Sequence, residues 1–549
     1  MNNIKTKKIR HPKGLIPAAL ANMGERFGYY VMNAVLLLFL LSKFGLSDKT
    51  GGMIYSFFYA GIYVLSLVGG IIADRLKNYK GTIQTGLIIM GVGYVLLSIP
   101  ILATADNKAW LLTFTCIALF LIAFGNGLFK GNLQAIVGQM YDNLEKEAEK
   151  EGETALKEAK AKRDPGFQIF YVFINIGGLI APFVAPLLRG WWLKKNILDY
   201  NAELPALCHK FLKFGEIMVG PDASIEQLGK APQLYDNLIQ LTEKVSGAAV
   251  TATEQLTAFC TNYLDVFNTG IHYSFIASVA AMLISLVIFF FSKKMFPNPI
   301  KVKNEIESYT NEERIKMAKE IKQRIFALFA VLGIVVFFWF SFHQNGTSLS
   351  LFAKDFIITS KVPPEIWQAI NPFFVITLTP LIIWIFAKLR NKGKEPSTPM
   401  KIAIGMGIAG LAFLFTTIVS YTNHYPSADE FKGIAEVTRE GLKEGPWVLI
   451  VLYFFLTVAE LFISPLGLSF VSKVAPKNLL GLCQGLWLAA TAVGNGLLWI
   501  GPWLYNKYPI WICWLVFVIL CTVSMIIMLG MLKWLVRVTS ERKETVRIN

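Results

Sequence analysis

The chain has 549 residues, of which 54% are hydrophobic and 16% are charged, with a mean hydropathy of +0.49 and a formal net charge of +16. Charged residues make up about a quarter of a soluble globular protein, so this composition excludes an ordinary soluble fold and favours a membrane protein. A basic chain could bind nucleic acid, but the same charge is expected when basic residues lie in loops on one face of a bilayer.

Apolar segments that are long enough to cross a bilayer recur along the whole chain. A hydrocarbon core of ~30 Å needs ~20 apolar residues in a helix. The first such segment follows the basic residues 1–14 and is too long for the apolar core of a signal peptide, so we interpret it as a transmembrane helix. Twelve helices are predicted, at approximately residues 15–42, 52–74, 82–104, 109–140, 167–190, 271–292, 324–353, 364–388, 400–421, 446–473, 481–505 and 511–533.

The positively charged residues predict the orientation of these helices. Twelve is an even number, so both termini should lie on the same side of the membrane. Most of the 53 Lys and Arg residues fall in loops on that side, and such residues accumulate in cytoplasmic loops. We therefore expect a multi-pass protein of the cell (inner or plasma) membrane with both termini in the cytoplasm, and this explains the net charge without nucleic acid.

Three segments outside the membrane complete the predicted domain organisation. Residues 191–270 contain helical runs and should form a small extracellular or periplasmic helical insertion. One role to test for this insertion is the docking of an extracellular partner. Residues 297–323 should form a cytoplasmic amphipathic linker, and the charged run 142–165 a solvated inner helix or hairpin. The predicted order is the N-terminus 1–14, helices 1–5 in 15–190, the insertion, helix 6 in 271–296, the linker, helices 7–12 in 324–533 and a cytoplasmic tail 534–549.

Two of the six cysteines, Cys208 and Cys260, lie in this insertion. The outer side of a membrane is oxidising in most settings. The sequence leaves two expectations open, a disulfide between these residues or two unpaired thiols.

Ionisable residues interrupt several predicted membrane helices: Glu25 and Arg26 in helix 1, Lys130 in helix 4, His343 in helix 7 and Glu460 in helix 10. Such groups are costly in a bilayer and normally pair or line a watery cavity. Glu25 could pair with a neighbouring cation such as Lys130 and only lock the helices together. Arg26, Lys130 and Glu460 instead predict a dipolar cavity between the two halves, because two cations can bind a carboxylate and Glu460 can bind an ammonium group.

Aromatic and amide residues extend this predicted cavity. Amphipathic rings would give it walls for varied side chains, and amides in apolar helices need polar partners. The residues that we expect to contribute are Tyr29, Tyr30, Tyr63, Asn175, Asn371, Ser464 and Trp487.

Several motifs together resemble the proton-dependent oligopeptide transporter family. In the first half these motifs are ERFGYY, GGIIADR, GNGLFKGN and FQIFYVFINIGGLIAP. In the second half they are FWFSFHQNG, INPFFVITLTP, AELFISPLGLSFVSKVAPKN and GLWLAATAVGNG. The resemblance spans both halves in order and leaves only the loops and the 191–270 insertion outside it. It implies an all-α major facilitator fold of two six-helix bundles, and uptake of di- and tripeptides driven by protons.

The resemblance also implies roles for individual residues. The peptide carboxyl end would meet Arg26 and Lys130, and its amino end would meet Asn175, Asn371 and Glu460. Side-chain pockets would be lined by Tyr29, Tyr30, Tyr63 and Trp487. The inner gate between helices 2 and 3 would contain Asp74 and Arg75. No cofactor is implied, only the proton as a coupling ion.

Two departures from the family pattern affect the expected coupling. Asn22 and His343 stand where the family has glutamates linked to protons, and Gly131 and Gly178 replace a proline and a serine. Histidine titrates near neutrality, with an unperturbed pKa of ~6.5. One hypothesis is that His343 or Glu25 carries the coupled proton, and the other is that coupling is weakened or absent.

Other functional classes remain as alternatives. An uncoupled or differently coupled carrier could move a non-peptide amine or an anion, although Glu460 favours a ligand with a free amine. A membrane-embedded enzyme would need a nucleophile–base or metal cluster, and the five histidines are scattered along the chain. A channel would not need the two-half plan, which is typical of alternating access.

Overall fold

The structure is a computed structural model. It describes residues 9–540 except positions 47, 105, 202–203, 219–224, 248–252, 298–310, 359–368, 433–440 and 477–478. Within these residues, eleven helices are long and apolar enough to cross a membrane. The predicted linker and C-terminal tail therefore fall partly outside the described residues.

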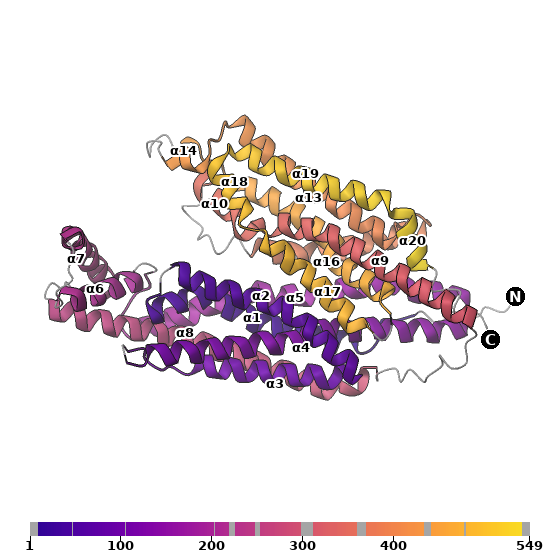
Figure 1. The fold of residues 1–549 in the computed structure, drawn as a ribbon, viewed down its shortest axis with the longest axis horizontal. Coiled ribbons are helices and arrows are strands. Elements are labelled where there is room, and N and C mark those ends of the chain that lie inside the picture. The colour runs from indigo at the N-terminus through magenta and orange to yellow at the C-terminus, as the bar shows by residue number, and fades with distance from the viewer. Residues whose placement is uncertain are drawn as a thin grey trace.

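The helices form two bundles, one from each half of the chain (Figure 1). The N-terminal half contains α1 (Leu15–Phe44), α2 (Asp48–Leu76), α3 (Tyr79–Ser98), α4 (Lys108–Glu151), α5 (Glu153–Lys195) and α8 (Thr253–Ser292). The C-terminal half contains α9 (Asn311–Phe342), α12 (Ile370–Asn391), α13 (Thr398–Thr422), α16 (Trp447–Val474), α17 (Leu480–Gly496) and α19 (Ile510–Gly530). The halves meet chiefly where α2 and α4 pack on α17 and where α5 packs on α12 and α16.

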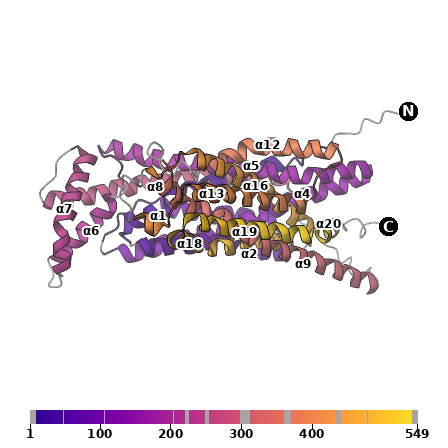
Figure 2. The same cartoon turned by 90° about the horizontal axis from the view of Figure 1, so that it is seen from above.

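Shorter elements connect or extend these helices. They are α6 (Leu204–Met218) and α7 (Ile225–Ser246) in the insertion, η1 (Lys293–Met295), η3 (His343–Gly346), α10 (Ser348–Phe356), α14 (Ala428–Lys432), α18 (Ile500–Lys507) and α20 (Leu532–Ser540). The insertion lies at one end of the molecule and both described termini lie at the other, as Figure 2 also shows. We call these the insertion end and the terminal end.

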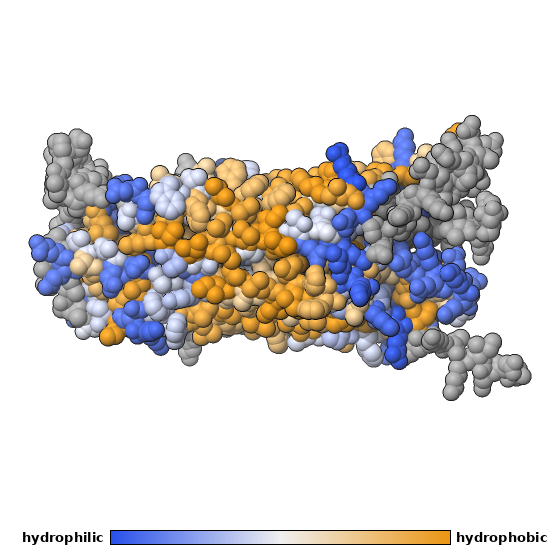
Figure 3. All heavy atoms as spheres, turned by 90° about the horizontal axis from the view of Figure 1, so that it is seen from below, coloured by the Kyte–Doolittle hydropathy of each residue, from blue (hydrophilic) through white to orange (hydrophobic). Residues whose placement is uncertain are grey.

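On the face shown in Figure 3, apolar side chains cover the middle of the molecule and polar side chains gather towards both ends. Large exposed apolar residues such as Phe57, Ile117, Leu187, Phe290 and Ile526 belong to the long helices. In water this surface would be costly, but hydrocarbon accepts it. The chain is therefore an all-α, multi-pass membrane protein with a small helical insertion.

The predicted eleventh helix is broken, and this explains why the count of long apolar helices is eleven and not twelve. α17 ends at Gly496, and the N–H of Leu497 bonds to the carbonyl of Gly494, three residues back. α18 begins at Ile500 and continues to Lys507. Two short helices thus occupy the segment that the sequence predicted as one, at 481–505.

Helices at the terminal end extend beyond a bilayer. α4 has 44 residues, which gives a length of about 66 Å at about 1.5 Å per residue. It turns at Gly152, whose φ of 117° suits glycine, directly into α5. The charged run 142–165 is therefore a hairpin made of two helix ends.

Two other predicted boundaries also lie within longer helices. α8 begins at Thr253, eighteen residues before the predicted start of helix 6. α9 begins at Asn311, so the described part of the predicted linker forms its first turns. A charged, strongly helix-forming sequence can continue a membrane helix into water, whereas hydropathy detects only the apolar part.

Candidate functional site

The cationic side of the predicted cavity is organised around Arg26 on α1. Its guanidinium makes two 2.6 Å hydrogen bonds to the carboxylate of the adjacent Glu25, and Asn126 on α4 donates a third bond of 2.6 Å to that carboxylate. Both charged side chains are buried. The guanidinium also lies 4.8 Å from the ring centroid of Tyr29. Glu25 is thus satisfied by Arg26 and Asn126, and not by Lys130.

Lys130 on α4 contributes a second cation. Its ammonium group lies 4.8 Å from the ring centroid of Tyr63 on α2. Within the described part of the chain it has no carboxylate at salt-bridge distance. An ammonium that is held by an aromatic ring and not by an acid can accept a ligand carboxylate.

A line of tyrosines continues from Tyr63 towards the insertion end. Tyr59 and Tyr55 follow at intervals of one helical turn, with ring centroids 5.4 and 6.2 Å apart along the line. Tyr55 donates a 3.0 Å hydrogen bond to Asn33 on α1. These side chains are half-buried, so they form a polar aromatic wall above the cations.

The acidic side is organised around Glu460 on α16. Asn371 on α12 donates a 2.7 Å hydrogen bond to its carboxylate, and Tyr171 on α5 donates another. Asn371 also donates to Thr457 at 3.1 Å. Among the described residues Glu460 has no cationic partner within salt-bridge distance. Its negative charge is held by neutral donors, which leaves it available to a ligand cation.

The helix α5 connects the two sides. Asn175 donates a 3.0 Å hydrogen bond to the backbone carbonyl of Tyr171, one turn away. Gly178 faces the ring of Tyr30, because a Cβ at Gly178 would lie 3.2 Å from that ring. Tyr171 and Gly178 are seven residues apart, a rise of about 10 Å along the helix. The Tyr30 side of α1 and the carboxylate of Glu460 therefore contact the same short stretch of α5.

Trp487 on α17 packs against α16. A Cβ added to Gly467 would lie 2.0 Å from the Trp487 ring, so only glycine admits the indole at this position. Ser464 is buried on α16, one turn from both Glu460 and Gly467. Asn22 is buried on α1, one turn before Glu25 and Arg26. Trp487, Ser464 and Asn22 therefore all lie on helices that contribute to the site.

His343 is held by neighbours in the C-terminal half. It begins η3, and its Nδ1 is 2.5 Å from the side-chain oxygen of Asn495 on α17. Its ring stacks on that of Trp339, with 5.0 Å between centroids. The sequence suggested that His343 stands where a carboxylate would face Arg26, but its hydrogen bond and its stacking contact are both with residues of the C-terminal half.

The terminal end contains the first of two sets of polar contacts between the halves. Asp74, at the end of α2, accepts hydrogen bonds from the backbone N–H groups of Gly481 (3.1 Å) and Leu482 (2.7 Å) and from the Tyr79 hydroxyl on α3. A carboxylate at a helix N-terminus is favoured by the free N–H groups there. Arg75, which the sequence analysis placed with Asp74 at an inner gate, is exposed.

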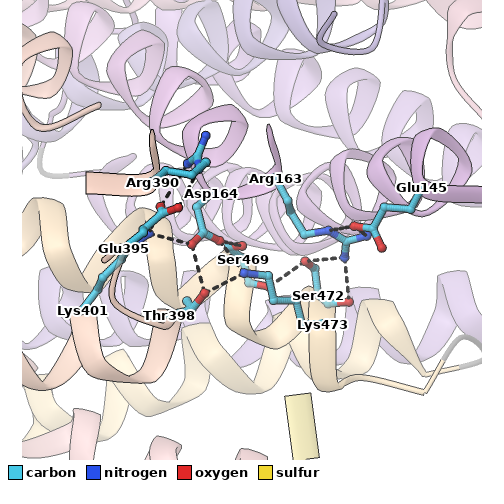
Figure 4. Close-up of polar contacts among 10 residues, drawn as sticks. All are labelled: Glu145, Arg163, Asp164, Arg390, Glu395, Thr398, Lys401, Ser469, Ser472 and Lys473. Atoms are coloured by element: carbon cyan, nitrogen blue, oxygen red, sulfur yellow. Dashed lines mark hydrogen bonds and ion pairs between the residues drawn. The ribbon is translucent and has the colours of Figure 1, made fainter. Parts of the chain in front are cut away.

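A buried carboxylate, Asp164 on α5, forms the second set (Figure 4). Its partners all come from the C-terminal half, and two of them are lysines. They are Ser469 at 2.5 Å, Lys473 at 2.6 Å, Thr398 at 3.0 Å and Lys401 at 3.2 Å. Together with Asp74, this carboxylate holds the two bundles against each other at the terminal end.

Neighbouring charges extend this cluster. Lys401 also pairs at 2.8 Å with Glu395, which in turn receives a 2.6 Å hydrogen bond from Arg390. Burial raises the pKa of Glu395, but hydrogen bonds and charge from Arg390 and Lys401 outweigh it and hold the pKa below its ordinary value. Arg163 binds Asp142 at 2.6 Å within its own half.

Arg163 also crosses to the other half, where it donates to the backbone and hydroxyl oxygens of Ser472 at 3.3 and 3.2 Å. This contact and those of Asp164 were not foreseen from the sequence. The residues Tyr171 and Asn126 were also missed, although each lies inside a motif that was singled out. A search for polar residues one turn from Asn175 and Lys130 would have found both.

Comparison with known proteins gives a consistent result. The model of the POT family matches residues 80–203 and 300–510, which is more than half of the chain. The chain is 25% identical over 500 residues to a dipeptide and tripeptide permease B of Edwardsiella piscicida, covering 90% of this chain and 86% of the relative. It is 26% identical to the peptide transporter YePEPT of Yersinia enterocolitica, covering 88% and 86% of the two chains.

Solved structures show the same fold. A crystal structure of a peptide transporter POT in complex with sulfate is similar with a TM-score of 0.57 and 21% identity, and 96% of each chain is covered. The similarity extends across both bundles, and it supports the two-bundle major facilitator architecture expected from the sequence.

Proposed function

This chain belongs to the POT family, and we propose that it is a secondary transporter that imports di- and tripeptides. The names of its relatives in that family, dipeptide and tripeptide permeases and a peptide transporter, support this substrate class.

One observation carries the proposal, which is the separation of unpaired charge across the two halves. Among the residues that the structure describes, Lys130 has no carboxylate partner on one side, and Glu460 is held only by neutral donors on the other. A peptide in its zwitterionic form has one charge of each sign at its two ends. Binding it would pair both protein charges at once, which a simple anion or amine would not do.

Arg26 has a different part in this proposal. Its guanidinium is already paired with Glu25, so a peptide carboxylate must either share the guanidinium or displace Glu25. Protonation of Glu25 would release Arg26 to the peptide. Glu25 is therefore our preferred group for the coupled proton, and His343 is the alternative that the sequence left open.

Alternating access is proposed from the contacts between the halves. In this structure Asp74 and Asp164 join the two bundles at the terminal end. We infer that this arrangement exposes the substrate site towards the insertion end, and that release requires these contacts to break. With the basic loops at the terminal end, we propose that this end is cytoplasmic and that the direction is import.

A binding panel tests the substrate class. Purified protein would be screened by thermal shift against dialanine, trialanine, N-acetyl-dialanine, free alanine, a monoamine and nitrate. A ligand that binds only the folded state raises the melting temperature by mass action. We expect stabilisation by dialanine and trialanine alone. Stabilisation by nitrate or the monoamine, without stabilisation by peptides, would favour the alternative of a non-peptide carrier.

A further inference from the structure

The helical insertion contains two thiols that the fold brings together, although 52 positions separate them in the sequence. Cys208 lies on α6 and Cys260 lies near the start of α8. Both side chains are fully buried. Both are free thiols in this structure, and they lie close enough that Cys260 raises the pKa of the Cys208 thiol. The remaining four cysteines lie in membrane helices.

Contacts one turn away fix the register of this pair. The Tyr263 hydroxyl on α8 receives a 3.1 Å hydrogen bond from the backbone N–H of Asn201, and the Asn201 side chain caps the start of α6 at Leu204. Cys208 lies one turn after Leu204, and Cys260 lies about one turn before Tyr263. The helices α6 and α8 contact each other, and these hydrogen bonds place the first turns of α6 beside this part of α8.

The same part of α6 is also attached to α1. The Nε2 of His209 lies 2.5 Å from the backbone carbonyl of Ser42, which can only accept, so this nitrogen carries the proton. Gly45, with a φ of 54°, ends α1 directly below the imidazole, and a Cβ there would lie 2.8 Å from its Nδ1. Cys208 is therefore presented to Cys260 by a helix that is held on two sides.

We propose that Cys208 and Cys260 form a disulfide that fixes the insertion to the transmembrane bundle. The two thiols give up two protons and two electrons, and a disulfide of a thiol–disulfide oxidant accepts the electrons. One thiolate attacks that disulfide and forms a mixed disulfide. The second thiolate then attacks the bonded cysteine sulfur, and the oxidant leaves as a dithiol.

The burial of the pair determines when this reaction takes place. A hydrogen bond that the Cys208 thiol donates to Cys260, together with burial, raises the pKa of Cys208, so the packed thiol is a poor nucleophile. The exchange therefore occurs before α6 packs against α8, and the finished bond is shielded from reductants afterwards. It needs the insertion to lie on the oxidising side of the membrane.

Counting thiols tests the proposal directly. The full-length protein, purified without reductant, would be denatured and treated with a maleimide–polyethylene glycol reagent, which retards the protein once for each free thiol. We expect four of the six thiols to react without reductant and all six after reduction. Cys260→Ser should give the same count with and without reductant, whereas the control Cys116→Ser should still gain two thiols on reduction.

Two further readouts make each outcome decisive. A non-reduced digest should contain one crosslinked peptide pair that joins Cys208 to Cys260. Because the folded protein shields the bond, melting temperatures are compared without reductant, and the wild type should melt at a higher temperature than the Cys208→Ser/Cys260→Ser variant. Six reactive thiols without reductant, or a crosslink between other cysteines, would overturn the proposal. Uptake of dialanine should be equal in wild type and double variant, since neither thiol lies at the substrate site, so this test is independent of the proposed substrate.

Discussion

Removal of the charge of Asp164 should open the terminal end. Its carboxylate accepts hydrogen bonds from four groups of the opposite half, and two of these are the ammonium groups of Lys401 and Lys473. The exposed fraction of the side chain is 11% for Asp164, 2% for Lys401 and 23% for Lys473, so solvent screens the pair with Lys401 only weakly and the pair with Lys473 more strongly. In Asp164→Asn the amide keeps the shape of the side chain but loses the attraction to both lysines.

The size of the effect follows from these contacts. A hydrogen bond to a charged group contributes about 1.5–3 kcal/mol, and loss of one partner of a buried ion pair costs about 3–5 kcal/mol. Lys401 keeps Glu395 as a partner, which places the expected loss near the lower limit, at about 3 kcal/mol. A tenfold change corresponds to about 1.4 kcal/mol, so the equilibrium should shift roughly 100-fold towards separation of the bundles at this end.

Double electron–electron resonance, which measures the distance between two spin labels, can measure that shift. Labels at Glu149→Cys and Lys392→Cys, both exposed at the terminal end, would be introduced in a Cys116→Ser background. Asp164→Asn should add or enlarge a long-distance population, and the exposed control Glu153→Gln should leave the distribution as in wild type. Identical distributions for Asp164→Asn and wild type would refute the view that this carboxylate holds the halves together.

Three smaller perturbations test other parts of the structure. Gly467→Ala forces a methyl group into the Trp487 ring; this overpacking should lower the free energy of unfolding by about 1–3 kcal/mol and therefore lower the melting temperature. At Gly410 the nearest atom to an added Cβ is 3.5 Å away, so Gly410→Ala should leave the melting temperature unchanged. His343→Gln in proteoliposomes should alter the pH dependence of uptake if this residue carries the proton, and an unchanged profile would exclude it. Burial, and secondarily the charge of Lys162, lowers the pKa of His11 to about 4. The stability that neutral His11 contributes is therefore complete above about pH 6.5 and is lost as the pH falls towards 4. Between pH 7.5 and pH 5 the melting temperature of His11→Gln should fall less than that of the wild type.

Much of the fold could be predicted because bilayer thickness imposes a length on each apolar segment. The predicted segments match the described helices for most of the chain, and the charged residues Arg26, Lys130 and Glu460 were found because ionisable groups stand out in apolar sequence. Hydropathy could not show the break after Gly496. Hydropathy also missed the continuation of α9 back to Asn311. Neither the break nor this extension changes the apolar content of the membrane segment, which is all that hydropathy measures.

The pairings within the site were less predictable. Neighbouring residues on a helix point in different directions, so the ion pair between Glu25 and Arg26 is not suggested by their adjacency. Asp164 gathers residues from α13 and α16 that lie more than 200 positions away. Such contacts depend on how the two bundles meet, and a single sequence contains no signal for that.

The central claim is that Glu460 binds the free amino group of a peptide, and uptake into proteoliposomes tests it most directly. Radiolabelled dialanine and N-acetyl-dialanine would be compared in wild type and Glu460→Gln, with an inward proton gradient. The glutamine can still accept the hydrogen bond from Asn371, so the fold should be preserved. We predict that Glu460→Gln lowers dialanine uptake at least tenfold, since one charge-assisted contact of about 1.5–3 kcal/mol is lost, and leaves the smaller uptake of N-acetyl-dialanine unchanged. An equal reduction for both peptides, or none for either, would contradict the account.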